Sequence, residues 1–597
     1  MKGIYLNYNT PVKSGEKLKI TLRIKNDYGF ASDVRVLFNR YGQKPGEEAN
    51  FELSFKEDLS DKNYSTFCGE IALNSLGYHT FYISLKINGI QKSIFYSSQE
   101  DGPVLVSDIQ SNLEFWKCFS YLKTFTTPDW VKGGIMYQIF VDTFYCKDPS
   151  ESMKSKLVSW DTFPKWKPDS DGVYRNDQYY GGNIKGIIEK LPYIKSLGVN
   201  VIYLTPIFKG SSSNRYDTID YESIDEMVGT WYELAELKRK ANDMGIKIVL
   251  DVVFNHASSE SPLIKEYPGL FTNGFWWGYE TLVEFNKNNP KYYELLEKWL
   301  TNISKFVDGL RFDVADELPD FVLRFIRATA KKLNILIYLL GEVWKNAVTG
   351  DFRSFLYGDE LDGVMNYQFA NAIYRMVRWK NFKYFKGIIK DIKMLYPPEA
   401  LDVSPIFLSS HDIPRIPNIL VGDFMKEDPR FENAWNMEQD GFWYTNGKFD
   451  TYKFRLWEFE NDKFSREIFK LAKRYQKVAI FMQYTFPGLP SIFAGDEIGM
   501  TGYKDPFNRK PFDWNNIDYD IYNFYVKLGA FRKAFKEIFS DSKRFVIYGK
   551  DGLKYDFETC TLTYSWKGNN GDLKCIVNLK DLKCAVYRNE KMEFVVN

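Results

Sequence analysis

Acidic, basic and histidine side chains follow four apolar segments of the chain, and their types are those of an acid–base active site. The residues are Asp251, Asn255 and His256 after the first segment, Arg311 and Asp313 in the second, Glu342 and Trp344 after the third, and His411 and Asp412 after the fourth. A single carboxylate after a strand most often caps a helix. Capping does not explain three carboxylates that share this placement with an arginine and two of the chain's three histidines.

This set of side chains matches the needs of glycoside hydrolysis. That reaction uses one carboxylate beside the anomeric carbon and one protonated carboxyl beside the leaving oxygen. Asp313 and Glu342 supply such a pair, and Asp412 is a third carboxylate that would hold the sugar. Arg311 lies two residues before Asp313, so both project from one face of a strand, where the cation would keep Asp313 ionised. No metal-ligand spacing such as HExxH appears, and we expect no required cofactor.

Eight near-continuous apolar segments carry these residues and alternate with amphipathic stretches such as 184–197 and 231–244. The predicted strands are 135–140, 199–205, 246–254, 309–314, 336–343, 363–367, 406–409 and 491–494. Apolar strands interleaved with helices indicate a parallel sheet that is buried on both faces. Eight such units predict an α/β fold, the (β/α)8 or TIM barrel, whose strand ends meet at one face.

All-β segments are predicted on both sides of the barrel. Residues 1–125 contain short alternating runs such as 18–24 and 81–87 between turn residues, which is typical of a β-sandwich. Residues 126–540 form the predicted barrel, with a short extra domain at about 256–290 and an insertion at about 419–462. Residues 541–597 return to β-like runs and predict a small C-terminal all-β domain.

Composition and charge limit the classes of partner. The net charge is +1, from 79 basic and 78 acidic residues, which argues against a nucleic acid or an acidic membrane. The six cysteines are scattered without a CxxC pair, so we expect free thiols. The start of the chain lacks a signal-peptide pattern and no apolar run reaches the length of a membrane span, so a cytoplasmic protein is expected.

The chain resembles the α-amylase family of glycoside hydrolases, and within it the branch of neopullulanases, cyclomaltodextrinases and maltogenic amylases. Besides the four strand-end motifs, the resemblance rests on TPDWVKG at 127–133, YQIF at 137–140, LPYIKSLG at 191–198, LTPIF at 204–208 and GDEIGMTG at 495–502. It covers nearly the whole chain, and the N-terminal β-domain is similar to the starch-binding-like domain of that branch.

The resemblance implies a role for each residue of the site. Asp313 matches the nucleophile, Glu342 the general acid/base and Asp412 the transition-state stabiliser. The substrate-binding candidates are His256 and His411 for sugar hydroxyls, Tyr216 for stacking, Arg311 as partner of the nucleophile, and Asp251, Asn255, Trp344 and Arg415. The family mechanism retains configuration through a covalent glucosyl-enzyme intermediate, which predicts carboxyls of Asp313 and Glu342 about 5 Å apart.

Four departures from the branch pattern leave the substrate preference open. Asn214 stands nearest the place of a usual histidine, Asp316 replaces a usual asparagine, Lys345 and Asn346 replace His-Asp, and residues 282–286 read LVEFN instead of MPKLN. Asp148, Gly181 and Asn183 are the candidates for a calcium site. The neighbouring Cys146 and Lys147 are poor ligands for calcium, which prefers six to eight oxygens.

Two aromatic segments have alternative interpretations. The insertion after the seventh strand carries Trp435, Trp443, Tyr444 and Trp457, and either walls the substrate cleft or packs on itself. Trp276 and Trp277, in the short domain after the third strand, either stack on sugar or pack that domain on the barrel.

Three functions are compared. The first is hydrolysis of small α-glucans, namely maltooligosaccharides, cyclomaltodextrins or pullulan fragments. The second is a 4-α-glucanotransferase, in which an acceptor sugar replaces water. The third is a catalytically silent glucan-binding protein, which the presence of Asp313, Glu342 and Asp412 disfavours. The resemblance also leaves a homodimer open.

Overall fold

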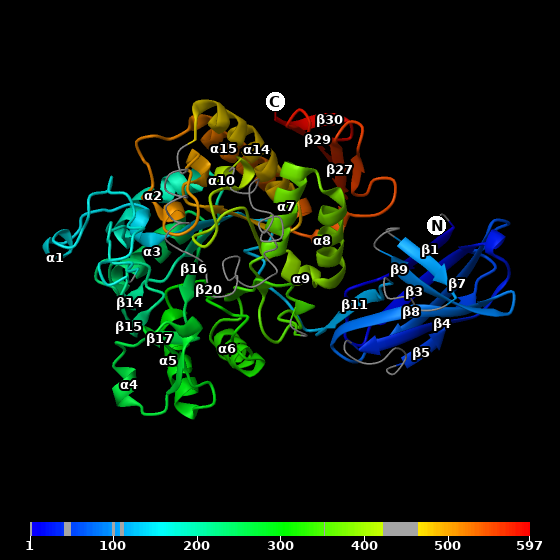
Figure 1. Ribbon diagram of the computed structural model, residues 1–597, viewed down its shortest axis with the longest axis horizontal. Helices are drawn as coiled ribbons and strands as arrows, with labels where there is room; N and C mark the ends of the chain where they lie inside the picture. The colour runs from blue at the N-terminus through cyan, green and yellow to red at the C-terminus, as the bar shows by residue number, and fades with distance from the viewer. Residues whose placement is uncertain are drawn as a thin grey trace. The chain divides into compact units, whose positions relative to one another are not determined.

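The computed structural model describes residues 3–40, 49–97, 102–107, 113–172, 174–350, 353–421 and 464–596. These form two compact units, one built from Met1–Thr126 with Asn346–Asp359 and Lys390–Glu399, and the other from the remainder (Figure 1). All six cysteines are unpaired, as expected. None of the helices within these ranges is both long and apolar enough to cross a membrane.

The first unit holds two sheets that share one apolar core. One sheet has the order β1-β3-β7-β6, and the other runs β10-β9-β8-β11-β2 with β4 and β5 attached. The strands are β1 (Ile4–Tyr8), β2 (Val12–Lys13), β3 (Lys17–Lys25), β4 (Ala31–Arg40), β5 (Ala49–Glu52), β6 (Ser54–Phe55), β7 (Tyr64–Ala72), β8 (Gly77–Ile87), β9 (Ile90–Ser97), β10 (Gly102–Val106) and β11 (Trp116–Tyr121). Alternate residues of β3 and β8 are buried, including Leu18, Ile20, Phe81 and Ile83, as the period of two in the sequence predicts.

The second unit contains the predicted parallel barrel. Its eight strands have the order β22-β21-β20-β16-β13-β12-β24-β23, and every hydrogen-bonded neighbour pair is parallel. The barrel strands are β12 (Met136–Ile139), β13 (Val201–Leu204), β16 (Lys247–Val252), β20 (Gly309–Phe312), β21 (Tyr338–Gly341), β22 (Gly363–Val364), β23 (Pro405–Phe407) and β24 (Leu489–Phe493). Asn366, just after β22, donates its N–H to the Pro405 carbonyl at 3.1 Å, which links the two ends of the sheet.

Helices alternate with these strands along the chain, and Figure 1 labels several of them, including α3, β16 and α5. The longer ones are α2 (Ile184–Ser196), α3 (Trp231–Asp243), α5 (Pro290–Ile303), α6 (Asp320–Leu333), α7 (Tyr367–Trp379), α8 (Phe382–Leu395), α14 (Arg466–Thr485) and α15 (Tyr519–Ala534). Local signals set several starts: Asn183 and Ser465 cap α2 and α14, and Thr230 with Glu233 forms a capping box on α3.

Two insertions of the barrel concern the site. Between β13 and α3, a hairpin pairs β14 (Phe208–Gly210) with β15 (Thr218–Ile224). Between β16 and α5, a small sheet has the order β17-β19-β18, from β17 (His256–Ser258), β18 (Phe271–Phe275) and β19 (Leu282–Phe285), with α4 (Leu263–Glu266) between the first two. Of the predicted insertion at 419–462, residues 419–421 end α10 (Ile416–Val421), and the rest, with its four aromatic residues, lies outside the described residues.

The C-terminal sheet packs on the barrel within the same unit. Its order is β25-β27-β28-β29-β30, with β26 on β27, from β25 (Phe545–Val546), β26 (Lys554–Asp556), β27 (Thr561–Trp566), β28 (Leu573–Asn578), β29 (Lys583–Arg588) and β30 (Lys591–Val596). Trp566 is fully buried and donates its indole N–H to the carbonyl of Thr485, at the end of α14.

Candidate active site

Arg311, at the end of β20, contacts the carboxylates of three neighbouring strands. Its Nη1 lies 2.9 Å from both carboxylate oxygens of Asp251 and 2.8 Å from Oδ1 of Asp313. Its Nη2 lies 3.0 Å from Oε1 of Glu342. The arginine side chain is fully buried, and the four side chains come from β16, β20 and the end of β21. The parallel sheet therefore brings the predicted pair Asp313 and Glu342 onto one shared cation.

Burial governs the protonation of this cluster. It raises the pKa of Asp313 well above the usual range and also raises the pKa of Glu342, while the positive charge of Arg311 opposes both shifts. Burial likewise raises the pKa of Asp251 to about 6. Arg311 thus lowers the pKa of Asp313, as predicted, but burial raises that pKa by more. One cation among three buried carboxyls favours retention of a proton within the set, and an acid/base pair needs one protonated and one ionised member.

Glu342, just after β21, accepts two hydrogen bonds besides its contact with Arg311. The Val314 N–H donates to its Oε2 at 2.8 Å, and the Tyr367 hydroxyl donates to its Oε1 at 3.3 Å. Val314 has a φ of 41°, a strained value for a β-branched residue, and this conformation accompanies the N–H contact to the carboxylate. Trp344 stacks on Tyr367 at 3.9 Å and donates its backbone N–H to Asp316 Oδ2 at 3.2 Å.

A chain of hydrogen bonds joins the barrel strands β12, β13 and β16 to the loop after β23. The Gln138 side-chain amide donates to His411 Nδ1 at 2.7 Å, so Nε2 of the neutral imidazole carries the hydrogen. That nitrogen lies 2.5 Å from the Tyr216 hydroxyl, which donates to Asp251 Oδ2 at 2.8 Å. Tyr203 donates to the same Asp251 oxygen at 2.6 Å. Burial and nearby arginines hold the pKa of His411 well below its usual value, in agreement with a neutral ring.

Asp412 lies beside a cation that the sequence reasoning missed. Arg509, in the short helix Phe507–Arg509 after β24, places Nη2 3.3 Å from Asp412 Oδ1 and donates its Nε–H to the His411 carbonyl at 2.7 Å. Arg509 lies in the loop after the eighth barrel strand, β24. Because all strand ends of a barrel meet at one face, the polar residues of that loop could have indicated it from the sequence. Asp412 is partly exposed, and its Oδ2 is 3.2 Å from His411 Nε2.

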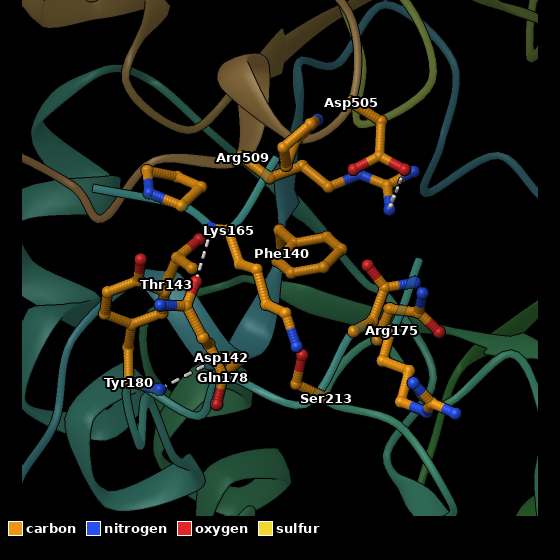
Figure 2. Close-up of a pocket in the computed structure, with 14 residues that line it drawn as sticks. Phe140, Asp142, Thr143, Lys165, Arg175, Gln178, Tyr180, Ser213, Asp505 and Arg509 are labelled. Carbon is orange, nitrogen blue, oxygen red and sulfur yellow. Dashed lines mark hydrogen bonds and ion pairs between the residues drawn. The ribbon is translucent and has the colours of Figure 1, made fainter. Parts of the chain in front are cut away.

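A pocket adjoins Asp412 and Tyr216. It is lined by Phe140, Asp142, Thr143, Pro164, Lys165, Arg175, Asn176, Gln178, Tyr180, Ser213, Asn214, Asp505, Pro506 and Arg509. Figure 2 shows Arg509 and Asp505 on one side of it and Gln178 and Ser213 on the other. These residues come from the loops after β12, β13 and β24, so the pocket lies at the strand-1, strand-2 and strand-8 side of the carboxylates. Its mixed polar and aromatic lining suits a polyhydroxylated ligand.

His256 has a different environment from His411. It is fully buried, and neither ring nitrogen makes a hydrogen bond of normal geometry with the described residues, although the nearby Tyr216 backbone favours its protonation. Burial lowers its pKa to about 3, so the ring is neutral. One face stacks on Trp276, with ring centroids 4.6 Å apart. Buried polar atoms without partners are costly, so these nitrogens are groups that a bound hydroxyl would satisfy.

The other predicted site residues support loops. Asn255 Nδ2 lies 3.5 Å from Glu317 Oε2, and Asn214 Oδ1 accepts the Tyr216 N–H at 3.1 Å. Arg415 is buried and donates to the carbonyls of Ala494 and Asn508 and to Asp496, which ties together the loops after β23 and β24. These contacts hold loops of the protein together, and a contact of Arg415 with substrate remains a prediction.

Calcium binding at Asp148, Gly181 and Asn183 remains a prediction, and two of these residues already use polar groups within the protein. Asn183 Oδ1 accepts the N–H groups of Lys147 and Gly186, and Gly181 presents an N–H to Asp142 Oδ1 at 3.2 Å. Within the described residues no group of three or more His, Cys, Asp or Glu side chains is placed to hold a metal ion. Calcium requires six to eight oxygen ligands, and we derive no catalytic step through it.

Comparison with known proteins agrees with this geometry. Residues 138–268 match the family model described as alpha amylase, catalytic domain. An amylopullulanase of Thermoanaerobacter thermohydrosulfuricus is 31% identical over 480 residues, 68% of this chain and 30% of its own length. Neopullulanase 2 of Thermoactinomyces vulgaris is 28% identical over 557 residues, 87% of this chain and 82% of its own length.

The solved structures add the fold. A cyclomaltodextrinase superposes with a TM-score of 0.64 at 22% identity, over 97% of this chain and 91% of that chain. The chain spans only 26%, 30% and 40% of the three amylopullulanases that it matches. The similarity therefore covers the barrel and its flanking sheets, while larger relatives contain much that this chain does not.

Proposed function

Because the chain belongs to the α-amylase family of glycoside hydrolases, we propose that it cleaves α-glucosidic bonds of small α-glucans with retention of configuration. The observation that carries this proposal is the buried cluster in which Asp313 and Glu342 contact one guanidinium, at 2.8 and 3.0 Å. Retaining glycosidases need two carboxyls close together, with one protonated and the other ionised.

The proposed mechanism assigns one task to each carboxyl. Asp313 attacks the anomeric carbon, and Glu342 protonates the departing glycosidic oxygen and later deprotonates the water that releases the sugar. Asp412, whose Oδ2 lies 3.2 Å from His411 Nε2, stabilises the positive charge that develops on the sugar. His256 donates to a hydroxyl of the reacting sugar, and Tyr216 supports its ring. Nε2 of His411 already lies 2.5 Å from the Tyr216 hydroxyl, so a direct contact of His411 with the sugar remains a prediction. The separation of the Asp313 and Glu342 carboxyls, expected at about 5 Å, remains a prediction.

The substrate class is proposed from the relatives. Proteins named neopullulanase, cyclomaltodextrinase and maltogenic alpha-amylase are 28–29% identical to this chain, and this supports maltooligosaccharides, cyclomaltodextrins and pullulan fragments as substrates. A 4-α-glucanotransferase would use the same covalent intermediate, and the yield of transfer products distinguishes the two. A cytoplasmic location and the homodimer remain predictions, and light scattering at working concentration tests the dimer.

The decisive experiment compares wild type with Glu342→Gln on cyclomaltodextrin, pullulan, starch and maltotriose. Glutamine keeps the shape of the side chain but supplies no acid proton, so we expect the rate to fall by about 10²- to 10⁴-fold. Glu236→Gln, on a partly exposed carboxylate of α3 that pairs with Lys240, is the matched control and should retain wild-type activity.

Two results would reject the proposal. Absence of new reducing ends from all four substrates with the wild type would exclude the hydrolase, and full activity of Glu342→Gln would exclude the acid/base assignment. NMR of the first product formed tests retention, because the α-anomer must appear before mutarotation if a covalent intermediate forms.

A further inference from the structure

Arg215, the residue before Tyr216, is a second arginine that is buried beside the site. Its Nη1 donates to the Ser213 carbonyl at 2.5 Å, and its Nε lies 3.3 Å from Oδ2 of the buried Asp225. Arg215 lies in the segment that connects β14 to β15, and Asp225 directly follows β15. Because an unpaired buried charge is strongly destabilising, this ion pair holds the connecting segment against the end of its hairpin.

A second carboxyl group, that of Asp142, is influenced by the same cation. Asp142 follows β12 and accepts the backbone N–H groups of Tyr180 and Gly181 at 3.0 and 3.2 Å. Burial raises the pKa of Asp142 to about 6, and the positive charge of Arg215 is the largest influence that opposes this rise. Arg215 therefore favours an ionised carboxyl in the loop after β12, besides the one with which it pairs in its own hairpin.

The backbone at Arg215 adopts a conformation that non-glycine residues seldom adopt. Its φ is 62°, in the left-handed region. Both of its backbone polar groups are engaged, since its N–H donates to the Ser212 carbonyl at 3.2 Å and its carbonyl accepts the Thr218 hydroxyl at 3.3 Å. Such strain persists where the surrounding contacts determine the conformation. The buried ion pair of the side chain is one of these contacts.

The next residue, Tyr216, is the one proposed to support the ring of the reacting sugar. Its hydroxyl donates to Asp251 Oδ2 at 2.8 Å and lies 2.5 Å from His411 Nε2, and its ring stacks on His411 with centroids 5.4 Å and planes 5° apart. These contacts fix the hydroxyl end of the side chain, whereas the turn at Arg215 fixes the backbone from which it extends. A displaced ring would misplace the sugar relative to the catalytic carboxyls.

Another buried arginine has surroundings of a different kind. Arg532 is fully buried and donates to three backbone carbonyls, among them those of Gly134 and Gly488. These glycines precede β12 and β24, so Arg532 lies at the end of the barrel opposite to the active site. Arg532 links segments of the barrel, whereas Arg215 pairs with a carboxylate of the hairpin that carries Tyr216.

We propose that Arg215 is a positioning residue of the reaction, whose guanidinium, paired with Asp225, maintains the backbone turn that places the Tyr216 ring beneath the reacting sugar. This inference rests on the proposed function, and Arg215 acts through Tyr216. Since the same cation influences Asp142, which lines the pocket of Figure 2, Arg215 also connects the position of that ring with the wall of the pocket.

The test is a double-mutant cycle on kcat/KM for maltotriose with the full-length enzyme. Arg215→Met keeps much of the side-chain volume and removes the charge, and we expect it to lower kcat/KM about 10²-fold, the cost of a small misplacement of substrate. Tyr216→Ala removes the ring through which Arg215 acts. In that background Arg215→Met should lower kcat/KM by less than about twofold, because effects that share one contact are not additive.

Three further variants separate positioning from folding. Arg215→Lys keeps the charge but not the fork of donors, and should lower kcat/KM only about tenfold. If the unpaired Asp225 prevents Arg215→Met from folding, Arg215→Met with Asp225→Asn removes both charges and takes its place in the cycle. Arg532→Met is the matched buried control, and any loss of kcat/KM that it causes should be the same with and without the Tyr216 ring.

A spectroscopic measurement tests the position of the ring without catalysis. The chain has three histidines, so NMR of protein labelled with ¹⁵N-histidine gives three sets of imidazole signals, and His411→Gln assigns one set by its loss. Arg215→Met should shift the His411 signals, because the Tyr216 ring stacks on that imidazole. The signals of His79, in the first unit, should stay in place, and Arg532→Met should leave the His411 signals unchanged.

Equal losses of kcat/KM from Arg215→Met with and without the Tyr216 ring would overturn the proposal, and so would unchanged kcat/KM or unchanged His411 signals in Arg215→Met. A wild type that cleaves no α-glucan would instead refute the proposed function. In that case the His411 signals would still show whether Arg215 fixes the position of Tyr216.

Discussion

The two histidines of the site have opposite surroundings. His411 accepts from Gln138, lies 2.5 Å from the Tyr216 hydroxyl and stacks flat on that ring, so the protein satisfies both of its nitrogens. His256 is as deeply buried, yet its nitrogens make no hydrogen bond of normal geometry with the described residues. We call the set of Gln138, His411, Tyr216 and Asp251 the bonded side, and His256 with the Trp276 ring stacked on it the open side.

The difference indicates how the work is divided. The bonded side is pre-organised, because its donors and acceptors are already paired and lose little freedom when substrate binds. The open side leaves the hydrogen-bonding capacity of His256 for the ligand. Substitutions on the bonded side should therefore cost stability, and substitutions on the open side should cost activity.

Removal of the shared cation should lower both stability and activity, and this is the largest expected effect. Arg311→Met leaves three buried carboxyls without a cation, and we expect it to lower the free energy of unfolding by about 3–5 kcal/mol. It should also abolish measurable activity, since the protonation of Asp313 and Glu342 depends on that charge. Urea denaturation and kcat measure the two effects. Arg239→Met, at an exposed ion pair on α3, should change stability by less than about 0.5 kcal/mol.

A substitution on the open side should affect activity far more than stability. His256→Leu keeps much of the buried volume and removes nitrogens that make no hydrogen bond of normal geometry with the described residues. We expect kcat/KM on maltotriose to fall about 10- to 100-fold, with a change in unfolding free energy below about 1 kcal/mol. A large loss of stability with little change in kcat/KM would show that His256 is a core residue.

The reverse is expected on the bonded side. Tyr216→Phe retains the ring but removes the hydroxyl between His411 and Asp251, which leaves buried groups unpaired. The free energy of unfolding should fall by about 1–3 kcal/mol, measured by urea titration, while kcat/KM falls about tenfold or less. Equal stability of Tyr216→Phe and wild type would remove the contrast between the two sides.

The smallest expected effect is a shift in pH dependence. Asp316 accepts the Trp344 N–H beside Glu342, burial raises its pKa to about 7, and the two carboxyls raise each other's pKa. Asp316→Asn keeps an acceptor but removes the negative charge, which favours ionised Glu342 and lowers its pKa. Because the acid must be protonated, the alkaline limb of kcat/KM should move to lower pH, by up to about one unit.

Asp243→Asn, an exposed carboxylate at the end of α3, is the control for that measurement and should leave the limb in place. Movement of the limb to higher pH in Asp316→Asn would contradict the assignment of Glu342 as the acid.

The sequence predicted the barrel well because each of its eight strands is an apolar run bounded by polar residues. Boundaries were less accurate where the next element continued the pattern. The sixth strand was predicted at 363–367 but ends at Val364, because Asn366 caps a helix that starts at Tyr367. Four strand-end motifs also predicted Asp313, Glu342, Asp412 and His411 as neighbours, and the contacts to Arg311 and Arg509 bring them together.

The partners of these residues could not be predicted in the same way. Arg509 is 97 residues from Asp412, and the link depends on how two loops fold over one another. Glu317 accepts the indole N–H of Trp277, 40 residues away, and a glutamate after a strand gives no sign of this role. Patterns along the chain report which face a residue occupies, whereas pairing across loops depends on tertiary packing.

The amide of Gln138 has a consequence for the whole bonded side. An amide nitrogen only donates, so it fixes which His411 nitrogen carries hydrogen, and thereby the sense of every bond as far as Asp251. The isosteric exchange Gln138→Glu replaces one nitrogen by oxygen and would reverse that sense, with Nδ1 as donor and the tyrosine hydroxyl turned away from Asp251. A one-atom change on β12 would thus reverse the donors and acceptors of a hydrogen-bond network that reaches four barrel strands, while the side chains keep their shapes.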